Sequence, residues 1–206
     1  QDTYNILKEY KFIVPCMNTD KICVFTNLGL MHQIKVLDIP AGKFRDKGVP
    51  IDNLCNYDSA KEYIIQVLDV QTMIHSTLLF ATAKSMLKVM DGDLLNASKR
   101  TVQATKLSED ELVAVIVADW SEESEDKVVL QTKDGVFLKF PYAEIPKKKK
   151  SALGVRGMKL SKDDLITNVY VMDAQNISSI MYKEKELEFN RLKLSKRDTK
   201  GTKVRR

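Results

Sequence analysis

Residues 128–166 read VVLQTKDGVFLKFPYAEIPKKKKSALGVRGMKLSKDDLI, and their pattern recurs upstream and downstream in the chain. The apolar run 128–130 meets the turn sequence TKDG at residues 132–135, after which the residues up to Phe140 alternate at the strand period of two. A basic loop follows, then an apolar segment, a polar corner and a last apolar run over residues 165–171. The stretch therefore predicts a β-hairpin followed by two more short strands, four strands in one unit.

Two markers indicate that this unit is repeated. The residue that opens the hairpin turn recurs at Thr26, Thr82, Thr132 and Tyr182. A second marker, after the basic loop, recurs at residues 48–50, 101–103, 154–156 and 201–203. The first marker has spacings of 56, 50 and 50 residues, and the second keeps the same register. We therefore infer an internal repeat of about 50 residues.

Repeats of this length with four short strands are typical of radial or solenoid folds, in which one unit cannot bury its apolar face alone. The sequence predicts an all-β fold, a propeller-like ring of about four four-stranded blades. One domain, residues 1–206, is expected, because no linker or change in composition divides the chain. The expected repeats cover approximately residues 20–74, 75–125, 126–176 and 177–206, the last completed by residues 1–19. Ring closure of this kind would remove exposed sheet edges.

The sequence contains no apolar run of about 18 residues, the length that would indicate a membrane-spanning helix. Its first residues, Gln1, Asp2 and Thr3, are neither a start methionine nor a signal peptide. We therefore expect a fragment of a larger cytosolic protein, with no membrane partner.

Residues that could support catalysis or metal binding are scarce. The three cysteines, Cys16, Cys23 and Cys55, form no CxxC pair, so we interpret them as small buried residues and expect no zinc site. The two histidines, His32 and His75, each stand alone in the sequence. The chain also lacks a serine nucleophile elbow, a Walker loop, a dinucleotide-binding glycine pattern and an HExxH motif. We expect no catalytic residue, no metal and no cofactor.

The formal net charge of +5 and the pI near 8.9 would alone barely favour a nucleic acid as partner. The positions of the charges are more informative, because basic residues gather between the second and third strands of each copy. Most acidic residues lie at the opposite corner, at residues 109–111, 122–126 and 163–164. The candidate DNA-binding residues are Lys43, Arg45, Lys47, Lys99, Arg100, Lys147, Lys148, Lys149, Lys150, Arg156, Lys196, Arg197 and Lys200.

If each repeat is one blade, equivalent loops lie at equivalent places and form a continuous basic track along the rim. Such a track suits a polyanion, because lysine and arginine neutralise phosphates and release counterions. Gly48, Gly154 and Gly201 either let the backbone approach a phosphate or simply serve tight turns. Aromatic residues are not interleaved with the charges, which favours the backbone of duplex DNA over stacked single strands.

Two rival functions remain open from the residues alone. A propeller-type protein-interaction module could use the basic rim for an acidic partner, and it would be indifferent to DNA at physiological salt. A stand-alone enzyme is the weakest alternative, because no acid, base and nucleophile constellation is found.

Several short motifs follow one another in a fixed order over nearly the whole chain. They are FTNLG at 25–29, IP at 39–40, KGV at 47–49, the segment 79–87, QTKDG at 131–135 and GVRGMKL at 154–160. In order and spacing they resemble the C-terminal repeats of the A subunit of bacterial type IIA topoisomerases, DNA gyrase and topoisomerase IV. The resemblance implies a β-pinwheel, in which blades exchange strands with their neighbours, and a role in binding and bending duplex DNA around the rim.

The same resemblance implies the partners of the chain. The parent would be an ATP-dependent topoisomerase, in which this non-catalytic domain presents a DNA segment to the catalytic core of the same A subunit, with the ATPase on the B subunit. In that family the DNA-cleaving tyrosine lies outside this domain, so no tyrosine here is expected to be catalytic. The implied location is the cytoplasm, in association with the nucleoid.

The sequence departs from the gyrase pattern in two ways. The gyrase box, a glutamine followed by two basic residues, two glycines, a basic residue and a glycine, is absent from every loop. The chain also has about four repeats, whereas a gyrase domain has six. Both departures favour topoisomerase IV or a diverged gyrase, and they predict DNA binding without strong chiral wrapping.

Overall fold

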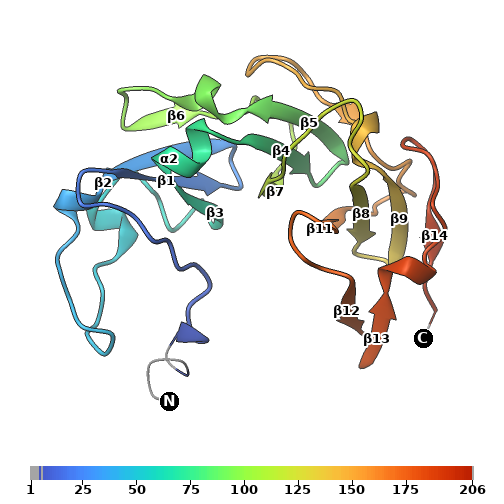
Figure 1. Cartoon of the computed structure of the whole chain (residues 1–206), viewed down its shortest axis with the longest axis horizontal. Coiled ribbons are helices and arrows are strands. Elements are labelled where there is room, and N and C mark those ends of the chain that lie inside the picture. Colours follow the sequence, from blue (N-terminus) through green and yellow to red (C-terminus); the bar gives the residue numbers. More distant parts are fainter. Residues whose placement is uncertain (1–4, 6, 206) are drawn as a thin grey trace.

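The computed structural model describes residues 5 and 7–205. Each repeat begins with an antiparallel hairpin (Figure 1). The hairpins are β1 and β2 (Lys21–Thr26, Leu30–Lys35), β4 and β5 (Thr77–Thr82, Met86–Asp91), β8 and β9 (Lys127–Thr132, Val136–Pro141), and β12 and β13 (Ser179–Tyr182, Lys185–Glu188). In the first three, the amide of Gly29, Ser85 or Gly135 donates to the carbonyl of the threonine that opens the turn, at 3.0 to 3.1 Å. The threonine marker of the repeat therefore closes each hairpin.

Two further kinds of strand complete each blade. An inner strand pairs with the first hairpin strand of its own repeat, and these strands are β3 (Ile64–Asp69), β7 (Leu112–Val117) and β11 (Ile166–Val171). A short outer strand pairs with the second hairpin strand of the preceding repeat, and these strands are β6 (Thr101–Gln103), β10 (Val155–Arg156) and β14 (Thr202–Lys203). The result is three four-stranded sheets, in the orders β3-β1-β2-β6, β7-β4-β5-β10 and β11-β8-β9-β14.

This exchange of outer strands confirms the β-pinwheel fold. The four strands of residues 128–171 form one sequence repeat but not one sheet, because β10 joins β5 of the preceding blade. Val155 lies opposite Leu87, and Arg156 lies opposite Met86. In this exchange the outer strand of the next repeat pairs with the free edge of each hairpin. Backbone hydrogen bonds therefore join neighbouring blades.

The two ends of the described chain remain apart. Strands β12 and β13 form a two-stranded sheet, and residues 5 and 7–19 add no strand to it. Residues 48–50, the marker of the first repeat, form no strand either. Figure 1 accordingly shows an open arc, with the N- and C-terminal blades at its two ends. The short helices are α2 (Val70–Ile74), η1 (Val36–Asp38), η2 (Ile51–Asn53), η3 (Gly92–Leu95), η4 (Tyr142–Glu144) and η5 (Phe189–Arg191).

The core lies between the blades. Blades 1 and 2 meet through residues such as Phe25 and Phe80, whose rings pack edge to face with centroids 6.1 Å apart. Blades 2 and 3 bury Leu79 and Phe140 between them, and Phe189 packs between blade 3 and the last hairpin. Because blade 2 is covered on both faces, its strands β4 and β7 are mainly apolar with no period-two alternation, and even Lys88 of β5 is buried.

Strand β9 is also buried on both faces. Lys139 is only 8% exposed, and its apolar neighbours Leu138 and Phe140 are buried as well. The Lys139 ammonium donates a hydrogen bond to the carbonyl of Phe189 at 2.9 Å, so it has a polar partner inside the protein. Burial lowers the pKa of Lys139 below its usual value, and nearby Lys127 acts in the same direction.

Candidate nucleic-acid interface

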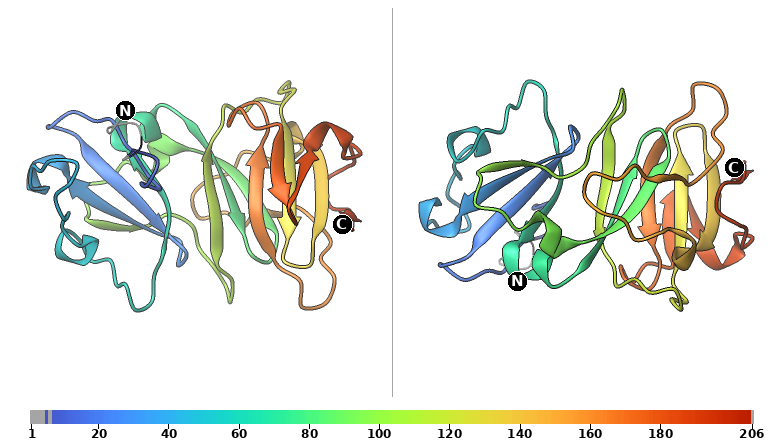
Figure 2. Two further views of the ribbon diagram at one scale, coloured as in Figure 1. Left: turned by 90° about the horizontal axis from the view of Figure 1, so that it is seen from below. Right: turned by 90° about the horizontal axis from the view of Figure 1, so that it is seen from above.

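The basic loops of repeats 2, 3 and 4 run along the outer edge of the arc. Strands β6 and β14 lie on the convex side, whereas β3, β7 and β11 lie on the inner side (Figure 1). The right-hand view of Figure 2 shows the loop of repeat 3 crossing from blade 3 onto blade 2. Each loop leads into the outer strand of its repeat, which lies at the edge of the preceding blade. The basic residues of the loops are therefore placed at the edges of successive blades.

Hydrogen bonds fix the loop of repeat 3 on blade 2. The amide of Lys148 donates to the carbonyl of Val89 at 2.7 Å, and the amide of Val89 donates to Pro146 at 3.2 Å. The buried ammonium of Lys88 donates to the carbonyls of Lys150 and Ala152, at 2.9 and 3.1 Å. Burial, with a smaller effect of Lys148, lowers the pKa of Lys88 below its usual value. The buried Lys88 ammonium therefore holds the backbone of this loop against the sheet.

The loops of repeats 2 and 4 are anchored in a similar way. The amide of Gln33 donates to the carbonyl of Arg100 at 2.7 Å, and its side-chain nitrogen donates to the carbonyl of Lys99 at 2.6 Å. The amide of Ser195 donates to the carbonyl of Lys139 at 2.8 Å. These contacts recur on the second hairpin strand of each blade, so the three loops share one position relative to the sheet.

We expect the substitution Lys88→Met to lower the free energy of unfolding by about 1 to 2 kcal/mol, because two loop carbonyls lose their donor while the apolar volume is kept. Urea denaturation measures this change, and amide hydrogen exchange should increase in residues 148–152. Lys84→Met, in the exposed turn between β4 and β5, is the matched control. Equal stability and exchange for both variants would contradict this role of Lys88.

Several predicted DNA-binding residues are already engaged by the protein. Lys147 forms an ion pair with Asp91 at 2.7 Å, and Arg156 forms one with Asp198 at 2.5 Å. Half-buried Arg197 donates from Nε to the carbonyl of Glu144 at 2.9 Å and from Nη1 to the carbonyl of Arg156 at 2.7 Å. The Lys147 ion pair joins the loop of repeat 3 to β5, and the Arg156 and Arg197 contacts join the segments of repeats 3 and 4. The three residues are therefore less available to a ligand than their neighbours.

The loop of the first repeat lies elsewhere. Lys43, Arg45 and Lys47 are exposed on residues 40–50, which form no strand and extend from the end of the arc (Figure 1). Asp46 lies beside them and accepts a hydrogen bond from the amide of Lys43 at 2.7 Å. The structure therefore brings three of the four predicted basic loops to one edge and leaves the first apart.

The glycines after the loops serve strand contacts. A Cβ atom on Gly154 would lie 2.6 Å from the backbone oxygen of Leu87, so only glycine lets β10 approach β5 this closely. Gly201 has a φ of +71°, and its Cβ would lie 2.8 Å from the oxygen of Phe137. Gly48, by contrast, has no atom within 4 Å of the position of a Cβ. Close packing accounts for the first two glycines.

The acidic corner holds the hairpin turns. Asp110 accepts from the amide of Lys84 at 3.0 Å, and Asp164 accepts from the amide of Asp134 at 3.1 Å. These acidic residues lie at the turn end of the hairpins, whereas the basic loops leave from the other end. The acidic residues 122–126 lie at the loop end instead, where the carbonyl of Asp126 accepts from the amide of Tyr142 at 2.9 Å, so the expectation that they share the acidic corner is wrong.

His32 is buried and bonded, although the sequence shows it alone. Its Nε2 lies 2.9 Å from Glu62 Oε1, and its Nδ1 lies 3.0 Å from the hydroxyl of Thr101 on β6. Burial would raise the pKa of Glu62, but hydrogen bonds from the Asp58 amide, His32 and Thr26 outweigh burial and lower it. This cluster joins the hairpin of blade 1 to β6, the outer strand that repeat 2 contributes to this blade. We therefore assign His32 a structural role.

The lowered pKa of Glu62 predicts a pH dependence. Because the unfolded chain binds this proton more tightly, the contribution of Glu62 to stability is present above its ordinary pKa of about 4.3 and is lost as the pH falls. The urea midpoint of the wild type should therefore exceed that of Glu62→Gln at pH 7, and the difference should shrink below about pH 4.3. Glu123→Gln, an exposed change, is the control. Parallel pH curves for Glu62→Gln and the wild type would contradict the prediction.

The described residues include no group of three or more histidine, cysteine or carboxylate side chains that could hold a metal ion. Of the cysteines, Cys23 is buried, and burial raises the pKa of its thiol to about 12. Cys16 is exposed, which corrects the interpretation of all three cysteines as buried residues. In the part of the chain that the structure describes, no helix is long and apolar enough to span a bilayer.

Comparison with known proteins identifies the family. The sequence profile described as the DNA gyrase C-terminal domain, a β-propeller, matches residues 20–67, 76–119 and 126–171. The chain belongs to this family. The resemblance seen in the sequence is therefore confirmed.

The relatives by sequence are DNA gyrase A subunits. The chain is 31% identical over 159 residues to that of Chlamydia pneumoniae, covering 75% of this chain and 18% of the relative. It is 29% identical over 167 residues to that of Lawsonia intracellularis, covering 80% and 20%. The chain thus spans about a fifth of the length of these relatives.

Solved structures support the fold. The C-terminal domain of DNA topoisomerase IV superimposes with a TM-score of 0.78 at 22% identity, over 91% of this chain and 59% of that one. The E. coli ParC C-terminal domain gives 0.71 at 17% identity, over 92% and 78%. The DNA gyrase A C-terminal domain gives 0.66 at 19% identity, over 92% and 61%.

Proposed function

We propose that this chain is a non-catalytic domain that binds and bends duplex DNA along its outer edge. The observation that carries the proposal is the equivalent anchoring of three basic loops on the edges of successive blades. A row of lysine and arginine side chains held at one edge can follow the phosphates of a duplex, and such contacts fix position without reading sequence. The membership of the gyrase C-terminal domain family supports the same function.

The side chains proposed to contact phosphates are basic residues of the three anchored loops for which the structure gives neither an ion pair nor a side-chain hydrogen bond. They are Lys99, Arg100, Lys148, Lys149, Lys150, Lys196 and Lys200. In this proposal Lys147, Arg156 and Arg197 shape the loops, and the exposed residues Lys43, Arg45 and Lys47 contact DNA only where it extends past blade 1. Bending a site of 20 to 30 base pairs costs about 1 to 6 kcal/mol, so several contacts must act together.

In the parent enzyme, we propose that the domain presents a DNA segment to the catalytic core of a type IIA topoisomerase A subunit for strand passage in the cytoplasm, at the nucleoid. The ATPase B subunit would be the further partner. The missing gyrase box favours a topoisomerase IV-like protein or a diverged gyrase. The gyrase A subunits among the relatives support the second of these. In either case the domain would hold and bend DNA without strong chiral wrapping.

The salt dependence of binding tests this function. With seven contacts, the plot of log affinity against log salt concentration should have a slope of about −6, at roughly −0.9 per phosphate contact. Fluorescence anisotropy of a labelled duplex of about 30 base pairs measures the slope. Loss of all binding near 0.15 M salt, the physiological range, would contradict the proposal and favour the protein-interaction alternative.

A further inference from the structure

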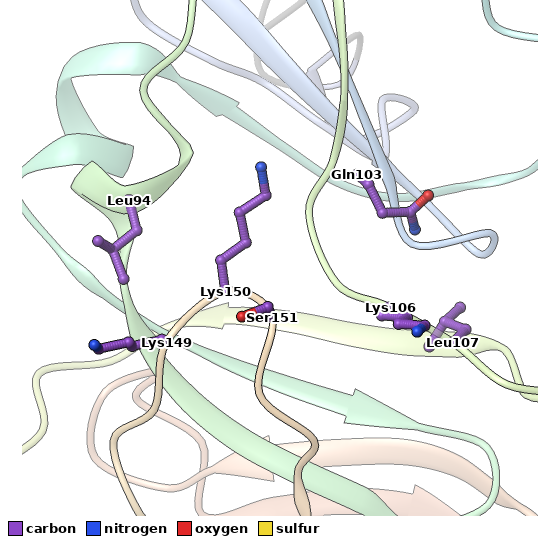
Figure 3. Close-up of a pocket in the computed structure, with 7 residues that line it drawn as sticks. All are labelled: Leu94, Gln103, Lys106, Leu107, Lys149, Lys150 and Ser151. Carbon is purple, nitrogen blue, oxygen red and sulfur yellow. The ribbon is translucent and has the colours of Figure 1, made fainter.

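A groove on the outer side of the arc lies between two of the anchored segments. One wall is the end of β6 and the segment after it, with Gln103, Lys106 and Leu107, and the other is the loop of repeat 3, with Lys149 and Lys150. Leu94 of η3 closes one end (Figure 3). The volume is about 780 Å³, within the range of pockets that bind small molecules.

The groove combines positive charge with apolar walls. Figure 3 shows Lys150 extending between Leu94 and Gln103, with Lys149 and Lys106 on opposite sides. No carboxylate lines the groove, and none of the three ammonium groups has an ion-pair partner among the described residues. This lining selects against cations and favours a ligand with concentrated negative charge.

Both walls are held in place without a ligand. On one side the Gln103 side chain donates to the carbonyl of Thr105 at 2.6 Å, and the amide of Ala104 donates to the carbonyl of Gly29 at 2.9 Å. On the other side Lys88 holds the carbonyls of Lys150 and Ala152. A preformed groove loses little conformational entropy when it binds a ligand.

A narrower slot adjoins the groove. Lys106 and Leu107 also line this second cavity of about 110 Å³, together with Met86, Leu87 and Leu153. More of the slot's lining is apolar than polar, although Lys88 and Asp110 also line it. A ligand that fills both spaces needs an anionic head and a short apolar arm.

We propose that this groove binds a soluble phosphate monoester of a short aliphatic chain, with the phosphate between Lys106, Lys149 and Lys150 and the chain in the slot. Three lysines suit a compact dianion, because each ammonium is a point charge with several donors. The groove has no aromatic side chain on which a base could stack, which favours an aliphatic body over a nucleoside. Because the slot holds only about 110 Å³, only a short chain fits in it.

This inference goes beyond DNA binding and does not depend on it. Lys149 and Lys150 belong to both surfaces, so a bound ester would compete with DNA for this part of the edge. The same residues could therefore link DNA binding to the concentration of a small metabolite.

Titration of the ¹⁵N-labelled chain with hexyl phosphate, without DNA, tests the proposal by NMR. The amides of Gln103, Leu107 and Ser151 should shift in a saturable way, and methyl phosphate, which has the same charge without the long chain, should bind at least about tenfold more weakly. Lys106→Gln should weaken hexyl phosphate binding by about three- to tenfold. Leu153→Ser, which removes an apolar side chain from the slot, should weaken it by about threefold. Lys162→Gln, the same charge change at the acidic corner, should leave binding unchanged.

Shifts spread equally over all lysine-rich loops, equal affinity for methyl phosphate, or no saturation would overturn the proposal. DNA retardation by the wild-type chain is measured separately. Retardation without saturable ester binding refutes the groove site alone, and ester binding without retardation refutes the DNA function alone.

Discussion

Replacement of Lys148, Lys149 and Lys150 together by glutamine is expected to weaken binding of a duplex of about 30 base pairs by roughly 10²- to 10³-fold near 0.1 M salt. Each lysine that neutralises a phosphate releases about 0.9 of a counterion, so three lost contacts also make the salt slope shallower by about 2 to 3. The loop backbone should keep its place, because Lys88 binds its carbonyls and not its side chains. Anisotropy at four or five salt concentrations measures both quantities.

The matched control removes the same charge from the opposite ends of the hairpins. Lys84, Lys162 and Lys183 are exposed at the turn between β4 and β5, at the acidic corner and at the turn between β12 and β13. Their joint replacement by glutamine should leave the salt slope within about 0.5 of the wild-type value, since none faces the proposed DNA path. An equal loss of slope in both triple variants would mean that net charge alone drives binding, without a defined edge.

The substitution Gly154→Ala is expected to lower the free energy of unfolding by about 2 to 3 kcal/mol. The added Cβ would lie 2.6 Å from the oxygen of Leu87, which is backbone, so a strand has to move. Displacement of β10 also releases the loop that it anchors, and DNA affinity should fall although no charge is lost. Chemical denaturation and anisotropy of the same samples measure the two effects.

Gly48→Ala is the control for the glycine change. No atom lies within 4 Å of the position of its Cβ, and residue 48 is the equivalent marker in a repeat whose strand is not exchanged. We expect a change in stability within about 0.5 kcal/mol. Comparable destabilisation by both substitutions would mean that glycine is needed for its turn geometry and not for the contact between blades.

Much of this architecture could be predicted from the sequence. The threonine markers identify hairpins because the turn has a fixed hydrogen bond, and a fixed turn gives a fixed spacing. The partner of β10 could not be deduced from the residues alone, because Val155 and Arg156 offer too little pattern to distinguish their own hairpin from the preceding one. The family resemblance supplied that information.

The candidate site was predictable in outline only. Basic loops are visible in the sequence, but the ion pair between Lys147 and Asp91 joins residues far apart in the chain. Lys88 and Lys139 were missed, because a lysine among strand residues normally indicates an exposed face. The available signal was their position on the second hairpin strand, beneath the next loop. Which of the basic side chains contact DNA stays a prediction.

A linking-number assay tests the central claim most directly. The chain is incubated with closed circular DNA, the DNA is relaxed by a type I topoisomerase, the protein is removed, and the topoisomers are resolved on a gel, with retardation measured in the same samples. We predict retardation with an unchanged linking number, because the edge binds and bends DNA without the gyrase box. A protein-dependent shift in linking number would contradict binding without chiral wrapping, and absence of retardation would contradict DNA binding by the outer edge.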